Sequence, residues 1–275
     1  PVYNASHLMG FFSVFNSDAV KNAKIYKGTA PAQYGGRLSS VLDIQMKDAT
    51  KEPQYQTCIE IKNKIGLQPL GLMTNQVYFD DPRRLTFLLS RYKFVSKMLS
   101  GKSKVAELGC GDAVGTRLVQ QEVASVTAYD FDPVFIEDIK QRQVERWAFN
   151  AHVHDILSGP LPYGPYEGVY SLDVMEHILP GDEHLYLGHI AQSLEPHGVF
   201  IVGMPSLESQ EWASPPSKAG HVNCKTGSDF KKSLEVYFSN VFIFSMNDEV
   251  VHTGFQRMAH YIIGVCCTPY ADPKK

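Results

Sequence analysis

The sequence predicts an α/β fold in which a doubly wound, largely parallel sheet carries helices on both faces. From residue 104 onward, short apolar runs alternate with helical segments, the pattern of repeated β-α-β units. A glycine-rich turn joins the first of these runs to a helix. The last two predicted strands are separated by about a dozen mostly polar residues, too few for a crossover helix, so they should form an antiparallel hairpin.

Helix-capping residues and apolar runs predict where the helices and strands lie along the chain. A helix should begin at Asp81-Pro82, because aspartate can cap a helix and proline suits its first position. Asp132 before Pro133 gives the same signal for a second helix. Strands are expected at 104–108, 125–129, 151–154, 168–172, 199–202, 241–246 and 259–265, and helices at 82–99, 133–146, 182–194 and 228–238.

The glycine turn, residues 107–112, reads Glu-Leu-Gly-Cys-Gly-Asp and predicts a nucleotide-binding site. Gly109 and Gly111 let the backbone approach a ligand where a strand becomes a helix, and Cys110 between them is expected to be a small residue that fits. The acids at both ends of the turn disfavour a diphosphate and favour a cationic ligand. Asp130 ends the next strand, where a carboxylate can accept both hydroxyls of a ribose.

This turn and three later segments, at residues 152–156, 171–177 and 194–202, resemble the motifs of class I S-adenosylmethionine-dependent methyltransferases in the correct order. The resemblance covers residues 75–268. The resemblance implies a Rossmann-like, seven-stranded sheet with an antiparallel terminal hairpin, and S-adenosylmethionine as cofactor. It departs from the family pattern at Ala113, where glycine is usual. The implied cofactor-binding residues are Glu107, Gly109, Cys110, Gly111, Asp130, Phe131, Asp155, Ile156, Ser171, Leu172 and Asp173.

Three of these acids have alternative interpretations. Asp132 could bind the ribose in place of Asp130, although its position before Pro133 assigns it the capping role. Asp155, which the resemblance places at the adenine, could simply end a strand. Asp173, which the resemblance places at the methionine end, could instead begin a helix.

Two histidines are candidate catalytic residues. His221, in the polar loop after the fifth strand of the methyltransferase pattern, is the preferred base, because a near-neutral imidazole can accept a hydroxyl proton. His177, in the Glu176-His177 pair after the fourth strand, is the second candidate. Each could equally be a structural, hydrogen-bonded residue. We expect no metal. A catechol-type magnesium site needs an acid after the fourth strand and a later Asp-Asn pair, and here only Asp173 and a reversed pair, Asn247-Asp248, are present.

The expected activity is methyl transfer to a small or sugar-like molecule, most simply to its oxygen. The alternatives are a cofactor-binding module without catalysis and, less favoured, a nicotinamide-dependent Rossmann enzyme. A net charge of −3 and the lack of a Lys/Arg run disfavour nucleic acid as a partner. No apolar stretch approaches a membrane span, and five scattered cysteines fit a reducing cytoplasm. We expect a methyltransferase of bacterial type. The oligomeric state stays open.

The beginning of the chain does not follow this pattern. Residues 1–48 resemble part of the plug domain of TonB-dependent outer-membrane receptors, although no barrel follows. We therefore expect an N-terminal extension over residues 1–50 and a methyltransferase domain over residues 51–275. Alternating residues at 23–27 and 40–46 could pair as strands.

Overall fold

A computed structural model of the protein describes residues 20–27, 40–46 and 54–274, and the chain divides into two compact units. The first unit, Pro1–Leu67, contains strands β1 (Val20–Lys27) and β2 (Ser40–Met46) and helix α1 (Gln54–Ile65). The two strands pair antiparallel, with Ile25 opposite Leu42, which confirms the predicted pairing. The predicted domain boundary after residue 50 stays a prediction.

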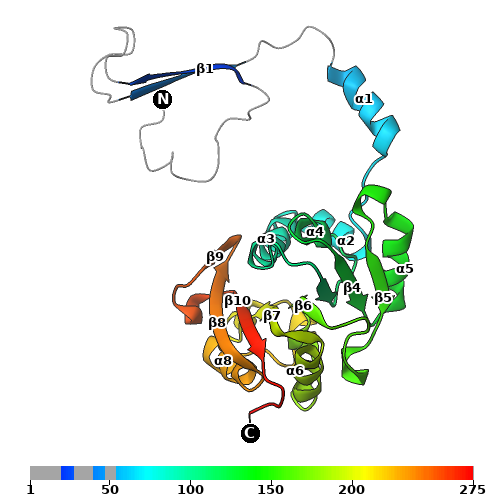
Figure 1. Ribbon diagram of the computed structural model, residues 1–275, viewed down its shortest axis with the longest axis vertical. Coiled ribbons are helices and arrows are strands. Elements are labelled where there is room, and N and C mark those ends of the chain that lie inside the picture. The colour runs from blue at the N-terminus through cyan, green and yellow to red at the C-terminus, as the bar shows by residue number, and fades with distance from the viewer. Residues whose placement is uncertain (1–19, 28–39, 47–53, 275) are drawn as a thin grey trace. The chain divides into compact units, whose positions relative to one another are not determined.

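The second unit, Gln68–Lys275, is built around one twisted sheet (Figure 1). Counted over the described residues, this sheet has eight strands in the order β5-β4-β3-β6-β7-β10-β8-β9. Strands β3 to β7 run parallel, and β10 pairs antiparallel with both β7 and β8, as the predicted fold requires. The strands are β3 (Val105–Leu108), β4 (Val126–Asp130), β5 (Asn150–Val153), β6 (Tyr166–Leu172), β7 (Leu194–Pro205), β8 (Phe238–Asn247), β9 (Val250–His252) and β10 (Tyr261–Pro269).

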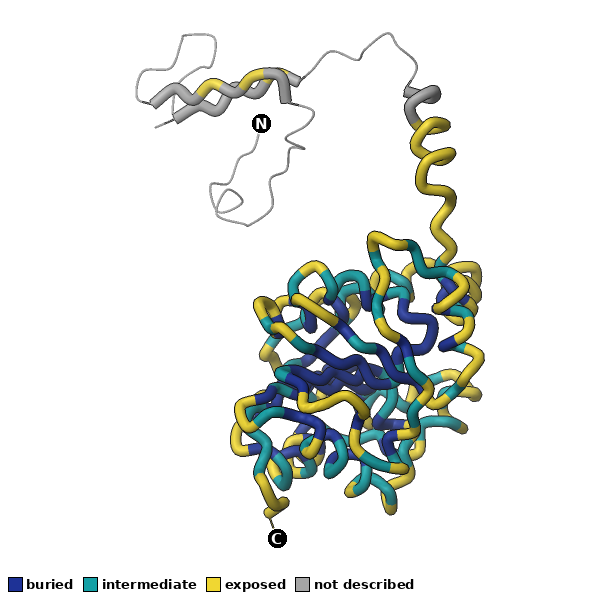
Figure 2. Tube along the Cα trace, turned by 45° about the vertical axis from the view of Figure 1, so that its right-hand side comes forward, coloured by how far each residue is buried: buried dark blue, intermediate teal, exposed yellow. Residues whose placement is uncertain are grey.

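Helices cover both faces of this sheet, and its central strands are buried (Figure 2). Residues of α3 and α4 pack on one face against Val105, Val126 and Tyr170, and residues of α6 and α8 pack on the other against Ala106 and Val169. The helices of this unit are α2 (Leu72–Asp80), α3 (Arg83–Met98), α4 (Thr116–Gln120), α5 (Pro133–Arg142), α6 (Glu183–Gln192), α7 (Pro215–Gly220) and α8 (Gly227–Glu235), with short 3-10 helices η4 (Glu145–Trp147), η5 (Ile156–Ser158), η6 (Met175–His177), η7 (Glu208–Trp212) and η8 (Gln256–Met258).

The structure corrects several expected element boundaries. Strand β7 begins at Leu194, before the expected start at residue 199, because Leu194 already pairs with Tyr166. The pairing is irregular between Leu194 and Val199. Helix α5 ends at Arg142, since the backbone of Gln143 is extended; the Gln143 side-chain amide donates to the Phe149 carbonyl. Helices α1, α2 and α7 and the short strand β9 were not predicted. Within the described ranges, none of the helices has both the length and the apolar character needed to cross a bilayer.

Candidate functional site

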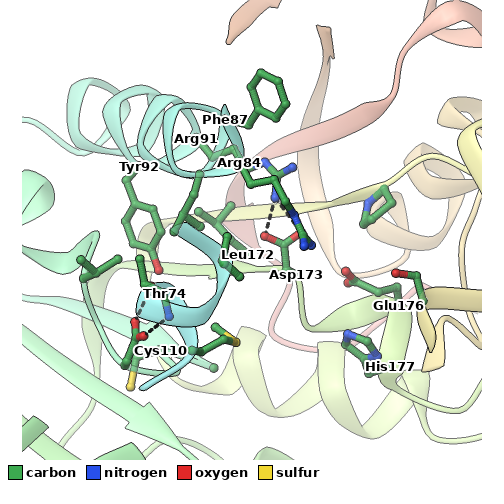
Figure 3. A pocket seen from close by; sticks show the side chains of 18 of the residues that line it. Thr74, Arg84, Phe87, Arg91, Tyr92, Cys110, Leu172, Asp173, Glu176 and His177 are labelled. Atoms are coloured by element: carbon green, nitrogen blue, oxygen red, sulfur yellow. Dashed lines mark hydrogen bonds and ion pairs between the residues drawn. The ribbon is translucent and has the colours of Figure 1, made fainter. Parts of the chain in front are cut away.

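A cavity of about 480 Å³ opens at the carboxyl ends of β3, β6 and β7, where ligands bind in open α/β sheets. Helices α2 and α3 form one wall, and η6 and α7 form the other. Figure 3 shows Thr74 and Cys110 toward one side of the cavity, Glu176 and His177 toward the other, and Asp173 between them. The volume of this cavity is in the range of small-molecule binding sites.

The glycine turn forms the floor of one side of this cavity. Gly109 has a φ of 72°, and a Cβ added there would lie 2.2 Å from the Val174 side chain, so glycine is required at this position. Its backbone N–H donates to the Tyr129 carbonyl at the end of β4. Ala113 has a φ of 54°, a left-handed conformation that glycine adopts with less strain. The departure from the family pattern therefore carries a conformational cost.

Glu107 lies beneath the turn and is almost completely buried. Three hydroxyl groups donate to its carboxylate: Tyr92 at 2.6 Å, Tyr170 at 2.8 Å and Thr116. Burial raises the pKa of Glu107 to about 7, although these three hydrogen bonds oppose the rise. Glu107 is not among the residues that line the cavity, so its contacts are with the protein interior.

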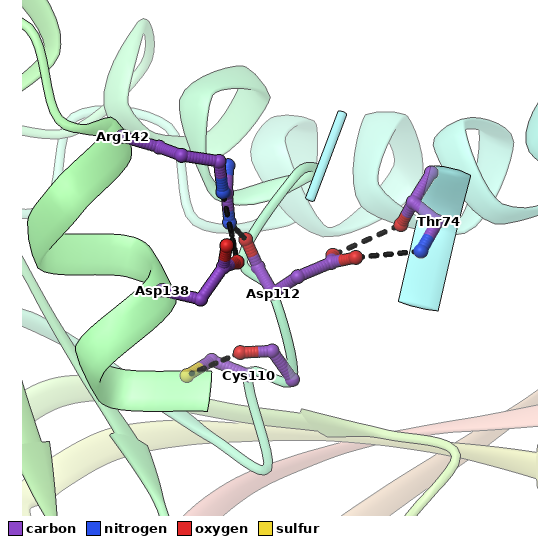
Figure 4. A network of polar contacts seen from close by, with 6 residues as sticks. Thr74, Cys110, Asp112, Asp138 and Arg142 are labelled. Atoms are coloured by element: carbon purple, nitrogen blue, oxygen red, sulfur yellow. Dashed lines mark hydrogen bonds and ion pairs between the residues drawn. The ribbon is translucent and has the colours of Figure 1, made fainter. Parts of the chain in front are cut away.

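Asp112 connects the turn to α2 (Figure 4). Its carboxylate accepts from the Thr74 backbone N–H at 2.6 Å and from the Thr74 hydroxyl at 2.9 Å. It therefore satisfies an unpaired N–H in the first turn of α2, as a capping residue would, but from a distant part of the chain. On the other side, Arg142 pairs with Asp138 and donates to the Asp112 carbonyl at 2.6 Å.

The residues expected around the adenosine lie at the ends of β4 and β5 and do not line the cavity. Asp130 accepts from the backbone N–H groups of Gly111 at 2.8 Å and Asp132 at 3.0 Å. The Asp132 side chain caps α5 by accepting from Val134, which confirms its capping role.

Three more of the expected residues sit near these strand ends or in the sheet. Phe131 is 75% exposed, directly after Asp130. Asp155 is exposed and caps η5, while Ile156 is buried beneath it. Ser171 is fully buried in β6, so no part of it reaches the cavity surface.

Asp173 and Leu172 line the cavity at the end of β6. Asp173 has a φ of 58°, and both of its carboxylate oxygens accept from Arg91, at 2.9 and 2.6 Å. The Arg91 guanidinium also lies 3.8 Å from the centre of the Tyr261 ring. Arg91 was not predicted, because it lies off the apolar face of its helix, at a position typical of an ordinary surface residue. Its pairing means that the Asp173 charge is already balanced inside the cavity.

Glu176, His177 and His221 form a cluster, the His–Glu cluster, at the side of the cavity away from the glycine turn. The two imidazole rings are 5.2 Å apart, centre to centre. The Glu176 carbonyl accepts from the backbone N–H groups of Val222 at 2.8 Å and Asn223 at 3.0 Å, and this holds the loop after α7 beside η6. The two predicted catalytic histidines therefore lie together, although nothing in the sequence places them in contact.

The cluster has unusual electrostatics. Burial, together with the nearby Asp173 carboxylate, raises the pKa of Glu176 well above its usual value. Burial and the adjacent His177 lower the pKa of His221, so His221 is neutral at physiological pH. In the sequence, Glu176 stands out only through its pairing with His177, and the third member of the cluster, His221, is distant from both.

Cys110 is buried in the glycine turn, and its thiol contacts the Gly111 carbonyl. Burial raises the pKa of the Cys110 thiol well above its usual value, so it stays protonated. A protonated, buried thiol is unreactive, which agrees with the interpretation of Cys110 as a small residue that fits the turn.

Comparisons with known proteins agree with this architecture. Residues 105–198 match a family model described as a methyltransferase domain, whereas no curated protein sequence matches the chain. Among solved structures, the methyltransferase domain of bacterial CtHen1-C is 18% identical, with 67% of this chain and 100% of that chain covered and a TM-score of 0.56.

Two further solved structures have TM-scores of 0.50. N-methyltransferase NodS from Bradyrhizobium japonicum, in complex with S-adenosyl-l-homocysteine, is 16% identical, with 68% of this chain and 87% of that chain covered. A TehB-like SAM-dependent methyltransferase from Corynebacterium glutamicum is also 16% identical, with 79% and 97% covered. At such identities the likeness establishes the fold, which is that of class I methyltransferases. The resemblance of residues 1–48 to a receptor plug finds no support in the comparisons, and much of that segment lies outside the described residues.

Proposed function

We propose that this chain, which is an S-adenosylmethionine-dependent methyltransferase, transfers the methyl group to a hydroxyl oxygen of a small-molecule acceptor. The observation that carries the proposal is the His–Glu cluster. It provides neutral imidazole nitrogens in the same cavity as the glycine turn, and a hydroxyl acceptor needs such a group to take its proton.

The residues around the strand ends fit an adenosine and an amino acid group. In this proposal Asp130 accepts the ribose hydroxyls, since two N–H donors leave further lone pairs on its carboxylate. Phe131, Asp155 and Ile156 contact the adenine, and the glycine turn supports the methionine part. Arg91 lies in the cavity and contacts Asp173 through Nη1 alone, so its other N–H groups can donate to the methionine carboxylate.

The chain's own residues then perform the proton transfer. When bound, S-adenosylmethionine supplies an activated methyl carbon for in-line displacement. His221 donates through Nδ1 to the Gln210 side-chain oxygen at 2.8 Å, which fixes the ring and leaves Nε2 as the acceptor atom. The lowered pKa of His221 keeps this nitrogen unprotonated and ready to take the acceptor's proton. His177, whose Nδ1 bonds to the Gly220 carbonyl, is the second candidate.

The cavity volume supports a small acceptor, because about 480 Å³ must hold the methionine end of the cofactor as well as the acceptor. The test is methyl transfer from labelled S-adenosylmethionine to fractions of a small-molecule extract. We expect label in an oxygen-methylated product. Cofactor binding with no transfer to any fraction would favour a binding module, and binding of NAD in place of S-adenosylmethionine would overturn the assignment of the cofactor.

A further inference from the structure

The His–Glu cluster has the composition of a metal site. One ligand atom from each of Glu176, His177 and His221 lies within 4.8 Å of the other two. Two imidazoles and one carboxylate form a ligand set that holds zinc and related divalent metals in proteins. The three side chains are held near one another by the backbone. Hydrogen bonds from the N–H groups of Val222 and Asn223 to the Glu176 carbonyl fix the loop after α7 against η6.

Both imidazole rings are oriented as metal ligands are. The Nδ1 atom of His177 donates to the Gly220 carbonyl at 2.9 Å, and that of His221 donates to the Gln210 side-chain oxygen at 2.8 Å. Because an oxygen acceptor requires the proton on Nδ1, each ring keeps a free lone pair on Nε2. Ligating histidines commonly make such a second hydrogen bond, which sets the tautomer and the ring orientation.

Glu176 gives the independent second observation. Its side chain is 1% exposed and lines the cavity, yet its Oε2 atom has no hydrogen-bond partner among the described residues. An unpaired, buried carboxylate oxygen costs free energy, and the ion pair nearby, between Arg91 and Asp173, does not include it. A cation at this position would satisfy the oxygen and offset the cost of burial.

We propose that Glu176, His177 and His221 bind one divalent cation of the zinc class through the carboxylate and the two Nε2 atoms. With metal–ligand bonds of about 2.1 Å, two ligands of a tetrahedral ion lie about 3.4 Å apart. Separations of up to 4.8 Å must therefore shorten by up to roughly 1.4 Å. Rotation of the exposed His177 side chain can supply this movement.

Three protein ligands leave coordination positions open toward the cavity. This inference deepens the proposed function, on which its catalytic meaning rests. The cation would hold the acceptor hydroxyl and lower its pKa, so that the proton leaves to water, and His221 would act as a ligand in place of a base.

The test is titration of the metal-free protein with Co²⁺, whose visible absorption reports nitrogen and oxygen ligands, with calorimetry using Zn²⁺ in parallel. We expect one equivalent to bind. His177→Ala, His221→Ala and Glu176→Gln should each weaken binding by tenfold or more; the last keeps the shape of a buried side chain and guards against misfolding. His197→Ala, which removes an exposed histidine outside the cluster, is the matched control and should bind as the wild type does.

Two results would separate this inference from the proposed function. If no saturable Co²⁺ binding occurs, or if all three variants bind as the wild type does, the metal site is wrong, and methyl transfer by the chelator-treated protein would leave the proposed function standing. If the metal binds at the cluster but no acceptor is ever methylated, the metal site stands and the proposed function fails.

Discussion

The two sides of the cavity differ in how completely their polar groups are paired. At the glycine turn, each buried carboxylate is paired within the protein: Glu107 with three hydroxyls, Asp112 with Thr74, and Asp130 with two backbone N–H groups. At the His–Glu cluster, a buried Glu176 oxygen has no partner among the described residues, and two imidazoles keep a nitrogen free. Carboxylates of the first kind fix the backbone of the turn, whereas groups of the second kind are available to a ligand or a proton.

The largest change we expect on the turn side comes from Asp130→Ala. It should weaken S-adenosylmethionine binding by roughly 1–3 kcal/mol, the scale of lost hydrogen bonds to a charged group, as measured by titration calorimetry. Asp132→Ala is the control, since Asp132 caps α5. The control should lower stability by about 1 kcal/mol and leave affinity unchanged. If the control loses affinity and Asp130→Ala does not, the ribose contact belongs to Asp132.

Removing the Asp112 carboxylate should separate α2 from the turn. Asp112→Ala should lower the free energy of unfolding by about 1.5–3 kcal/mol, because two hydrogen bonds to a charged, buried group are lost. Thr74→Val removes one of the two and should cost less. Denaturant unfolding of both variants and of the double variant measures the coupling between the Thr74 hydroxyl and Asp112. An unchanged free energy of unfolding in Asp112→Ala would show that this carboxylate does not hold α2.

The pairing of Glu107 does not fully offset its burial, so its charge should cost stability at neutral pH. The folded-state pKa, raised to about 7, lies above the unfolded value, so the folded state binds more protons between these two values. The free energy of unfolding should therefore fall as pH rises from about 4.5 to 7. Glu107→Gln should flatten this fall in chemical denaturation curves. An unchanged slope in the variant would contradict the raised pKa.

The smallest effect concerns the strained residue of the turn. Ala113→Gly should raise the free energy of unfolding by about 0.5–1 kcal/mol, because relief of the left-handed strain exceeds the extra entropy of glycine in the unfolded chain. Ala124→Gly, at an exposed alanine that is not left-handed, should lower it. Equal losses in the two variants would show that Ala113 is not strained.

The sequence predicted the fold because its signals are local. Asp132-Pro133 marks the start of α5, and Gly109 has the positive φ that the turn needs. The connection between β8 and β10 is too short for a crossover helix, and this predicted that the two strands pair antiparallel. The same connection contains strand β9, which was not predicted.

The rest of the site depends on contacts between distant segments. Thr74 meets Asp112 only because α2 folds over the turn, and His221 reaches His177 only because the following backbone binds the Glu176 carbonyl. Hydrophobic periodicity predicts helices and strands but not such contacts between distant segments. Thus the glycine turn could be predicted, whereas the cluster and its unpaired oxygen required the structure.

In the proposed function, the cavity has a cofactor side and a proton-accepting or metal-binding side. The most direct measurement compares His221→Ala with the wild type, using calorimetry for S-adenosylmethionine binding and label transfer to the identified acceptor for turnover. Loss of a positioned base or ligand should lower turnover by about a hundredfold or more and leave cofactor affinity nearly unchanged. Normal turnover, or a loss of cofactor affinity that accounts for the fall, would contradict this division.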